Sequence, residues 1–201
     1  MDIPAFSVTY DYRCPFARNA HEHIVAAMQA GAAWDVTFLP FSLTQTHVEE
    51  GGTPVWEDPA KAVDLLALEA SVVVRDQFPD RFLAAHEALF SARHDQAGDL
   101  RDEAVVRGAL EAAGVDADAV FEALRDGAAT KEVRRSHEAA VGDLHVFGVP
   151  TFIVGKHAVF VRLMSRPAGD AALARKTIEH VVSLIDDHPD LNEFKHTTVS
   201  F

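Results

Sequence analysis

The chain has 201 residues, of which 48% are hydrophobic and 24% charged, so it is long enough to bury a hydrophobic core. Eighteen basic residues stand against thirty-one acidic ones, giving a formal net charge of −13 that disfavours nucleic acid and anionic membrane surfaces as partners. No segment approaches the roughly 18 uncharged apolar residues that a membrane-spanning helix needs. The start, residues 1–4, lacks the basic and apolar regions of a signal peptide, so we expect a cytoplasmic protein.

The first forty residues predict a strand, a helix and a second strand. Apolar and polar residues alternate over residues 6–10, which is typical of a strand with one better-buried face. Apolar residues then recur at helical spacing up to Gly31, so a helix is expected to begin at Cys14. Apolar and polar residues alternate again over residues 34–38, which predicts a second strand. A unit of this size favours a parallel strand pair joined by a right-handed crossover.

The middle of the chain has the composition of a helical segment. Residues 41–57 show few periodic apolar positions and are predicted to form an irregular loop. From Asp58 onward alanine, leucine and charged residues recur at helical spacing, without any strand pattern. We predict helices over residues 59–77, 80–93, 100–113, 116–126 and 130–146.

The strand pattern returns near the C-terminus. Two short apolar runs, residues 151–154 and 158–162, flank a Gly155-Lys156 turn, which predicts a hairpin. A final helix is expected over residues 167–187. Three residues of the tail are expected to pack back onto the protein: Phe194, Val199 and Phe201.

This order of elements predicts an α/β fold, a thioredoxin-like core with an all-helical insertion. We assign residues 1–57 and 147–201 to the thioredoxin-like domain and residues 58–146 to the insertion. The junction between the first strand and the first helix then becomes the most informative part of the chain, because it holds the only cysteine.

Cys14 is predicted to be a reactive thiol. It stands at a helix N-terminus, where unpaired backbone N–H groups and the helix dipole favour thiolate over thiol. Arg13 adds positive charge, whereas Asp11 opposes it. Thiols in such settings have pKa values of about 3.5 to 7.5 instead of about 8.5. The alternative is an inert thiol, since unpaired cysteines are among the most buried residues.

The Gly148-Val149-Pro150-Thr151 segment is the second candidate element. By itself, Pro150 at the start of a strand is equally typical of an edge strand. In the predicted fold, however, this loop lies beside the N-terminus of the first helix. A cis Val149–Pro150 bond would turn the backbone polar groups of Val149 toward the sulfur, where an extended substrate can form hydrogen bonds.

The two elements and the helical insertion together resemble the DsbA-like group of thioredoxin-fold oxidoreductases. That group includes FrnE-like proteins, kappa-class glutathione transferases and 2-hydroxychromene-2-carboxylate isomerases. Within it, residues 11–15, 41–51 and 162–167 are similar to mycothiol-dependent oxidoreductases of the nitroreductase type. The resemblance implies that Cys14 is catalytic and that the following residues bind substrate or thiol: Asp11, Arg13, Pro15, Phe16, Val149 and Pro150.

One departure from the family pattern narrows the chemistry. Dithiol members carry Cys-x-x-Cys, and this chain has Ala17 in the place of the second cysteine. Cys14 therefore has no internal partner, and monothiol chemistry is expected: it attacks a disulfide or electrophile and is released by a second thiol. The expected co-substrate is a small thiol, mycothiol or glutathione, with no tightly bound cofactor.

Two other functions remain open. A kappa-like transferase or isomerase would use Cys14 to polarise a bound thiol cofactor without consuming the cysteine. A noncatalytic thioredoxin-fold binding protein would have kept the fold after losing the second sulfur. The expected partners of an enzyme are a small thiol and a second substrate, and the sequence allows a homodimer.

Eleven histidines raise the question of a metal site. His21 and His23 are two residues apart and point to different sides of the predicted helix, and the other same-helix pairs are eight residues apart. No metal site is therefore predicted. Surface or capping positions are expected for His21 and His23, with a position that faces the Cys14 pocket as the alternative. His137 is expected to be a core residue with its hydrogen bonds satisfied.

Overall fold

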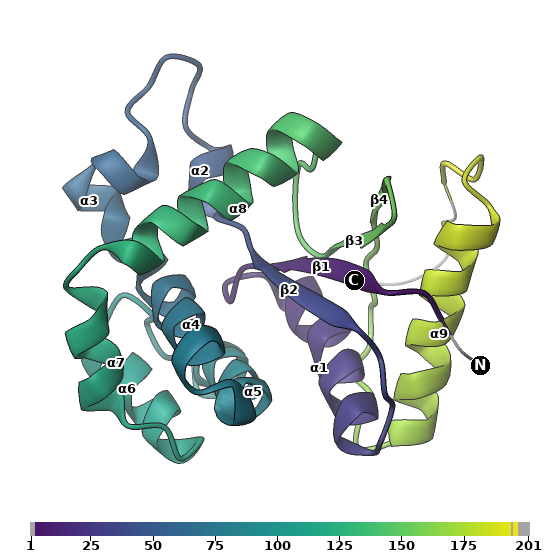
Figure 1. The fold of residues 1–201 in the computed structure, drawn as a ribbon, viewed down its shortest axis with the longest axis horizontal. Helices are drawn as coiled ribbons and strands as arrows, with labels where there is room; N and C mark the ends of the chain where they lie inside the picture. The colour runs from purple at the N-terminus through teal and green to yellow at the C-terminus, as the bar shows by residue number, and fades with distance from the viewer. Residues whose placement is uncertain (1–2, 194, 197–201) are drawn as a thin grey trace.

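A mixed four-stranded sheet with the order β2-β1-β3-β4 lies at the centre of the computed structural model, which describes residues 3–193, 195 and 196 (Figure 1). The strands are β1 (Phe6–Tyr10), β2 (Val36–Pro40), β3 (Thr151–Val154) and β4 (His157–Phe160). β1 runs parallel to β2, whereas β3 is antiparallel to both β1 and β4. The predicted parallel pair and hairpin are confirmed. The three tail residues Phe194, Val199 and Phe201 lie outside the described residues.

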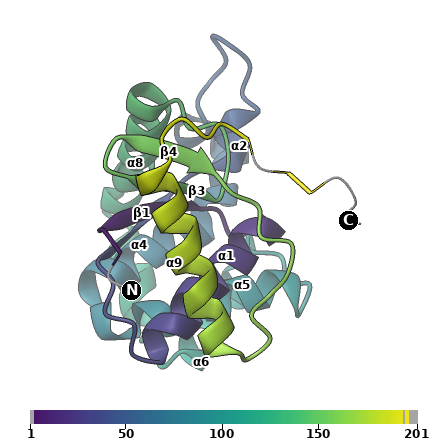
Figure 2. The same ribbon diagram turned by 90° about the vertical axis from the view of Figure 1, so that its right-hand side faces the viewer.

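Helices α1 (Pro15–Gln29) and α9 (Ala171–Asp187) pack side by side (Figure 2). α1 begins where the sequence predicts. α9 begins at Ala171 and not at residue 167, so that boundary prediction is wrong. Ala168 and Gly169 have φ angles of 51° and 82°, which a right-handed helix excludes, and the Asp170 side chain caps the helix by accepting the N–H of Leu173 at 2.9 Å.

The chain between β2 and β3 is helical, as predicted, with different boundaries. The predicted loop over residues 41–57 contains a short helix and a 3-10 turn at Val55–Glu57, and a second 3-10 turn at Val63–Leu65 interrupts the predicted helix over 59–77. The helices are α2 (Leu43–Thr46), α3 (Pro59–Ala62), α4 (Leu66–Gln77), α5 (Phe82–His94), α6 (Glu103–Ala112), α7 (Ala117–Leu124) and α8 (Ala128–Leu144).

The helical segment and the sheet share one hydrophobic core. A single cluster of buried side chains continues from the strands into α4 to α8, and α8 lies against β2 (Figure 1). Phe38 of β2 meets Phe82 of α5 with ring centroids 5.1 Å apart. The division into a core and an insertion at residues 57/58 and 146/147 stays a prediction. None of the helices that the structure describes is long and apolar enough to cross a membrane.

A chain of buried polar side chains ties α5 to α1 beneath the sheet. Tyr12 Oη lies 2.7 Å from His86 Nδ1, His86 Nε2 lies 2.8 Å from His21 Nδ1, and His21 Nε2 lies 3.2 Å from the carbonyl oxygen of Thr9. A carbonyl only accepts, so His21 Nε2 carries a proton. Burial lowers the pKa of His21 to about 4, so its ring is neutral at pH 7 and its Nδ1 accepts a hydrogen bond from His86 Nε2–H. Burial lowers the pKa of His86 as well, so its Nδ1 accepts from the Tyr12 hydroxyl.

The expectation that His21 and His23 are surface or capping residues is wrong. His21 is fully buried in the chain of hydrogen bonds, and His23 is buried with its Nδ1 2.8 Å from the carbonyl of Asn19. Burial is possible because backbone carbonyls and a second imidazole satisfy the ring nitrogens. The prediction that His137 is a core residue is confirmed, since it is buried and its Nδ1 accepts the N–H of Ser42 at 3.3 Å. The prediction that its hydrogen bonds are all satisfied is wrong, because its Nε2 has no partner among the residues that the structure describes.

Candidate active site

Cys14 is the N-cap of α1. Its backbone is extended, with φ −90° and ψ 117°, and its Sγ accepts the N–H of Ala17 at 3.4 Å. Pro15 follows at the first helical position, where the missing N–H costs nothing. The N–H of Cys14 itself donates to the carbonyl of Asp11 at 3.0 Å, which closes the turn between β1 and α1. The local sequence therefore holds the sulfur at the helix N-terminus.

The cis-proline loop brings a second backbone group to the sulfur. The Val149–Pro150 peptide bond is cis, and Cys14 Sγ–H donates to the carbonyl of Val149 at 3.3 Å, across 135 residues of chain. Thr151 anchors the loop, because its N–H donates to Thr9 Oγ1 at 2.9 Å and its hydroxyl donates to the carbonyl of Gly148 at 2.8 Å. Val149 and Pro150 are both buried. The structure thus joins the two elements that the sequence singled out.

Asp11 and Arg13 bind each other in the elbow. Asp11, 2% exposed, accepts the backbone N–H of Arg13 at 2.9 Å, two bonds from its guanidinium at 3.2 and 3.0 Å, and the N–H of Leu43 at 2.8 Å. Arg13 also pairs with Asp64 at 3.1 Å. These contacts fasten the elbow to α2 and to the segment before α4. A role for either side chain in binding a thiol stays a prediction.

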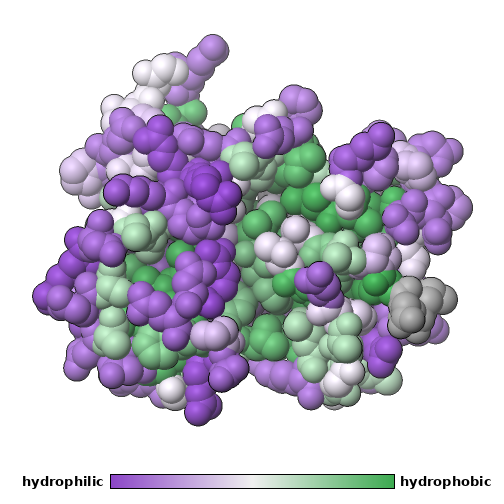
Figure 3. Space-filling view, viewed as in Figure 1, coloured by the Kyte–Doolittle hydropathy of each residue, from purple (hydrophilic) through white to green (hydrophobic). Residues whose placement is uncertain are grey.

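Several apolar residues adjoin Cys14 and the cis-proline loop along the chain. Cys14 is 8% exposed, Pro15 is exposed, and Phe16 is half-buried with the guanidinium of Arg162 5.4 Å above its ring. Phe147, two residues before Val149, is 72% exposed and lies against Phe160 with ring centroids 5.3 Å apart. Figure 3 shows hydrophobic residues gathered between the end of α8 and the hairpin.

Burial raises the pKa of the Cys14 thiol above its ordinary value, so the predicted depressed pKa is wrong for this structure. The N–H groups of Phe16 and Ala17 lower that pKa but do not offset the loss of water, and the Asp11 carboxylate raises it further. The charge of Arg13, expected to help, is already matched by two carboxylates. Cys14 therefore rests as a thiol bonded to the Val149 carbonyl.

The residues that the structure describes contain no group of three or more His, Cys, Asp or Glu side chains placed to hold a metal ion. A cavity of about 720 Å³ lies between α1, α5 and the loop before α9, and none of the predicted site residues lines it. A smaller groove of about 490 Å³ runs past Phe147, on the side of the cis-proline loop. None of the predicted site residues lines this groove either, but Phe147 stands two residues before Val149 of the cis-proline loop.

The model of the DSBA-like thioredoxin domain matches residues 7–164. This chain belongs to the DsbA-like thioredoxin-domain family. The match spans the cysteine elbow, the helical segment and the cis-proline loop, and it leaves all of α9 outside. The predicted family and fold class are thereby confirmed. No curated protein matched the sequence.

Several solved structures share this DsbA-like fold at low sequence identity. The cytosolic disulfide reductase DsbM from Pseudomonas aeruginosa, solved with GSH, is 14% identical, with a TM-score of 0.61 over 90% of this chain and 100% of DsbM. A probable DsbA oxidoreductase from Streptomyces coelicolor is 16% identical, with a TM-score of 0.60 over 96% and 93%. A 2-hydroxychromene-2-carboxylate isomerase is 16% identical, with a TM-score of 0.56 over 93% and 100%.

Sequence reasoning missed several polar contacts that hold the elbow of this DsbA-like domain. Tyr12 donates to His86, and its carbonyl lies 2.8 Å from Nε2 of His94. Both histidines belong to α5, more than seventy residues along the chain. The apolar neighbours of His86 in the sequence indicate a buried position, but no local pattern names its partner.

Alkylation of Cys14 by iodoacetamide is expected to be slow at neutral pH and to accelerate beyond the ordinary thiol pKa of about 8.5. The reason is that burial and the Val149 carbonyl both favour the protonated sulfur. The labelling rate measured against pH by intact mass reports on one residue, because the chain has a single cysteine. The urea-unfolded protein supplies the reference midpoint, and a native midpoint below it would contradict the expectation.

Proposed function

We propose that this DsbA-like domain is a cytoplasmic thiol-dependent oxidoreductase in which Cys14 is the single nucleophile and forms mixed disulfides with a small thiol. The observation that carries the proposal is the position of Cys14 Sγ at the start of α1, between the N–H of Ala17 and the carbonyl of Val149. Ala17 occupies the position of a resolving cysteine, so the second thiol comes from outside the chain.

The first step is thiol–disulfide exchange. Cys14 Sγ–H loses its proton to solvent and with it the hydrogen bond to Val149, while the N–H of Ala17 continues to stabilise the thiolate. The thiolate attacks one sulfur of a small disulfide, a new S–S bond forms at Cys14, and the other sulfur leaves as a thiolate. The vacated carbonyl of Val149 is then available to an amide N–H of the bound molecule.

The second step restores Cys14. A second small thiolate attacks the mixed disulfide at the sulfur of the attached molecule, and Cys14 leaves as a thiolate that takes up a proton. The net reaction exchanges one disulfide for another, so electrons balance without a redox cofactor. The raised pKa of Cys14 assists this step less than a low pKa would, because a more acidic thiol leaves faster.

The co-substrate is a small thiol, mycothiol or glutathione, acting with a second substrate and without a tightly bound cofactor. DsbM from Pseudomonas aeruginosa is a cytosolic disulfide reductase whose structure was solved with GSH, and this supports the glutathione class and the cytoplasmic location. The net charge of −13 disfavours nucleic acid and membrane surfaces as partners. A homodimer is compatible with the proposal.

A second candidate is a thiol transferase or isomerase in which Cys14 polarises a bound thiol and is not consumed. One specific observation favours it: Cys14 is buried, at 8% exposure, and its Sγ–H donates a hydrogen bond to the carbonyl of Val149. The isomerase among the structural neighbours shares the fold. In this case Cys14→Ser retains thiol binding and turnover, because a hydroxyl also donates a hydrogen bond.

The deciding experiment is intact-mass analysis of the native protein after exposure to glutathione disulfide, mycothiol disulfide and cystine. Stoichiometric addition of one thiol to Cys14, reversed by the matching free thiol, is the expected result. The Cys14→Ser variant is the control and should gain no mass. A native protein that stays unmodified by all three disulfides, while its unfolded form reacts, would overturn the oxidoreductase proposal.

A further inference from the structure

The groove beside the cis-proline loop contains a directed hydrogen-bond donor that the proposed chemistry does not use. The groove has a volume of about 490 Å³, within the range of roughly 300–1,000 Å³ typical of small-molecule sites. Its walls come from α2, from the last turns of α8 and from residues 146–147, and one of the residues lining it is the buried His137.

The hydrogen bond of His137 determines where its proton is. Nδ1 accepts the N–H of Ser42 at 3.3 Å, so the neutral ring carries its proton on Nε2. Burial lowers the pKa of His137 to about 4, so the ring is neutral at pH 7. No residue that the structure describes forms a hydrogen bond with Nε2, although His137 is only 5% exposed. The Nε2 atom is not wholly buried, and His137 lines the groove, so a molecule seated in the groove can replace solvent as the acceptor for this N–H.

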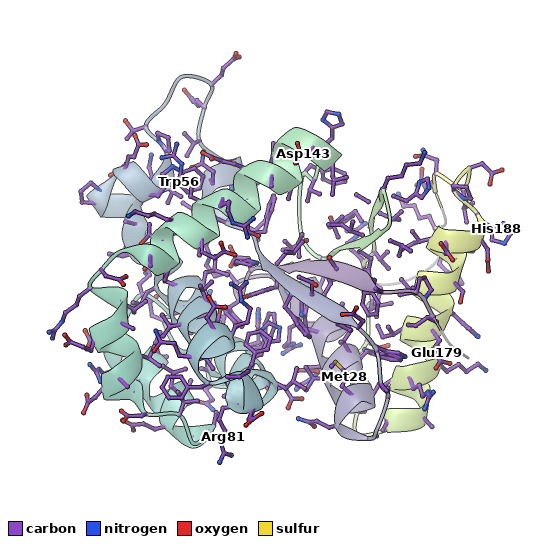
Figure 4. The ribbon with its side chains drawn as sticks, viewed as in Figure 1. Met28, Trp56, Arg81, Asp143, Glu179 and His188 are labelled. Atoms are coloured by element: carbon purple, nitrogen blue, oxygen red, sulfur yellow. The ribbon has the colours of Figure 1, made fainter. Side chains whose placement is uncertain are left out.

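The rest of the groove has the chemistry of an uncharged or anionic guest. None of its lining residues carries a carboxylate, in a chain with 31 acidic residues. Val141 and Phe147 offer apolar surface that is 40% and 72% exposed, and Gln45, Thr46 and His145 add polar groups at the rim. Trp56 lies on the other side of the α8 ribbon from the hairpin (Figure 4) and meets the His137 ring in a T-shaped contact at 5.7 Å.

Two short backbone links join the groove to Cys14. The adjacent N–H groups of Ser42 and Leu43 donate to His137 and to Asp11 respectively, and the Asp11 carbonyl holds the N–H of Cys14. On the other side, Phe147 is two residues from Val149, about 7 Å of extended chain. The groove is therefore connected to the cysteine elbow through residues 42–43 and to the cis-proline loop through Phe147.

We propose that this groove binds a small molecule with an apolar body and an oxygen acceptor, a carbonyl or a carboxylate, and that His137 Nε2–H donates to that oxygen. His137 is then a specificity-determining residue for the molecule that reacts at Cys14. The binding site stands on the groove alone, whereas the role of its guest rests on the proposed function. Preference for a carboxylate would indicate that the groove binds the small-thiol co-substrate. Preference for a carbonyl would indicate that it binds the second substrate.

The test uses the full chain with Cys14→Ser, so that no exchange reaction interferes, labelled with ¹⁵N-histidine. Acetophenone, benzoate and ethylbenzene are the probes, because the first two carry an oxygen acceptor and the third does not. At least one acceptor probe should shift the Nε2–H resonance of His137 and bind about tenfold more tightly than ethylbenzene, the value of one net hydrogen bond. Equal binding of all three probes, or none, would overturn the inference.

Variants separate the donor from the shape of the groove. His137→Asn keeps an acceptor for the Ser42 N–H but no longer reaches the Nε2 position, and should weaken the acceptor probe about tenfold. His137→Gln, which places an amide N–H near that position, should recover most of the loss. His180→Asn, an exposed position on α9, is the matched control and should bind as the parent does.

Phe147→Ala provides an independent check, because an exposed side chain is removed without risk to the core. It should weaken the binding of all three probes equally, since it removes apolar contact and leaves the His137 Nε2–H donor in place. Unchanged binding in both His137→Asn and Phe147→Ala would overturn the inference. Probe binding that fails while Cys14 of the parent protein accepts a small thiol refutes the inference and leaves the proposed function intact.

Discussion

Acidification from about pH 7 to about pH 5 is expected to destabilise the folded protein by about 2 kcal/mol for each of His21 and His137. Both histidines are buried and neutral, and burial lowers the pKa of each to about 4. The pKa of His86 is also lowered well below its ordinary value, by burial and by His21, so it adds to the loss. In the unfolded chain all three have pKa values of about 6.5.

The sign follows from proton counting. Below about pH 6.5 the unfolded chain takes up protons on these histidines and the folded chain does not, so stability falls as pH falls. The loss continues until the folded pKa values of about 4 are reached. Protonating His21 would also place two N–H groups opposite each other in its contact with His86, which removes the hydrogen bond.

Urea unfolding at a series of pH values measures this dependence directly. The free energy of unfolding should fall steadily between about pH 7 and about pH 5, where unperturbed carboxylates with pKa values near 4 remain ionised. His137→Asn removes one titrating group, so the slope of the free energy of unfolding against pH should decrease by the equivalent of about one proton. A free energy of unfolding that stays constant over this range would show that the histidines are protonated or exposed in the folded protein.

Replacing Asp11 by alanine is expected to cost about 3 kcal/mol or more, because it leaves the half-buried Arg13 guanidinium without its main partner. The N–H groups of Arg13 and Leu43 lose their acceptor as well. Since Asp11 fastens the elbow to α2, the same change should also alter the reactivity of Cys14.

The chain contains a matched control for this substitution. Asp99 and Arg101 have the same spacing and the same bonds as Asp11 and Arg13: a backbone N–H contact at 3.1 Å and a guanidinium contact at 2.8 Å. That pair is exposed, with side chains 53% and 59% accessible, so Asp99→Ala should leave the free energy of unfolding nearly unchanged. Equal losses from the two variants, measured by urea unfolding, would contradict the importance of burial at Asp11.

The amino-acid sequence by itself determined the elements whose signals are local. The alternation at residues 6–10, the Cys14-Pro15 pair and the Gly155-Lys156 turn each predict a structure within a few residues, and those predictions are confirmed. The start of α9 was mispredicted because Pro167 is permitted at a helix start, whereas the positive φ angles of residues 168 and 169 place the start further on.

The tertiary structure decided the properties of the candidate site that depend on burial. A helix N-terminus and a neighbouring arginine predict a thiolate at Cys14, but desolvation and the Val149 carbonyl keep the proton on the sulfur. The Arg13 charge is matched by carboxylates at positions 11 and 64. Desolvation is a property of the whole packed molecule, so no local pattern carries it.

The histidines show the same limit most clearly. Spacing within one helix predicts that His21 and His23 point to different sides of it. It does not indicate that His86, 65 residues further along the chain, forms a hydrogen bond with His21. Nor does the sequence indicate that Ser42 fixes the tautomer of His137 across 95 residues. Local periodicity determined which segments form strands and helices. Packing between distant segments decided which polar groups are paired, which keep a free donor, and which protonation state each one holds.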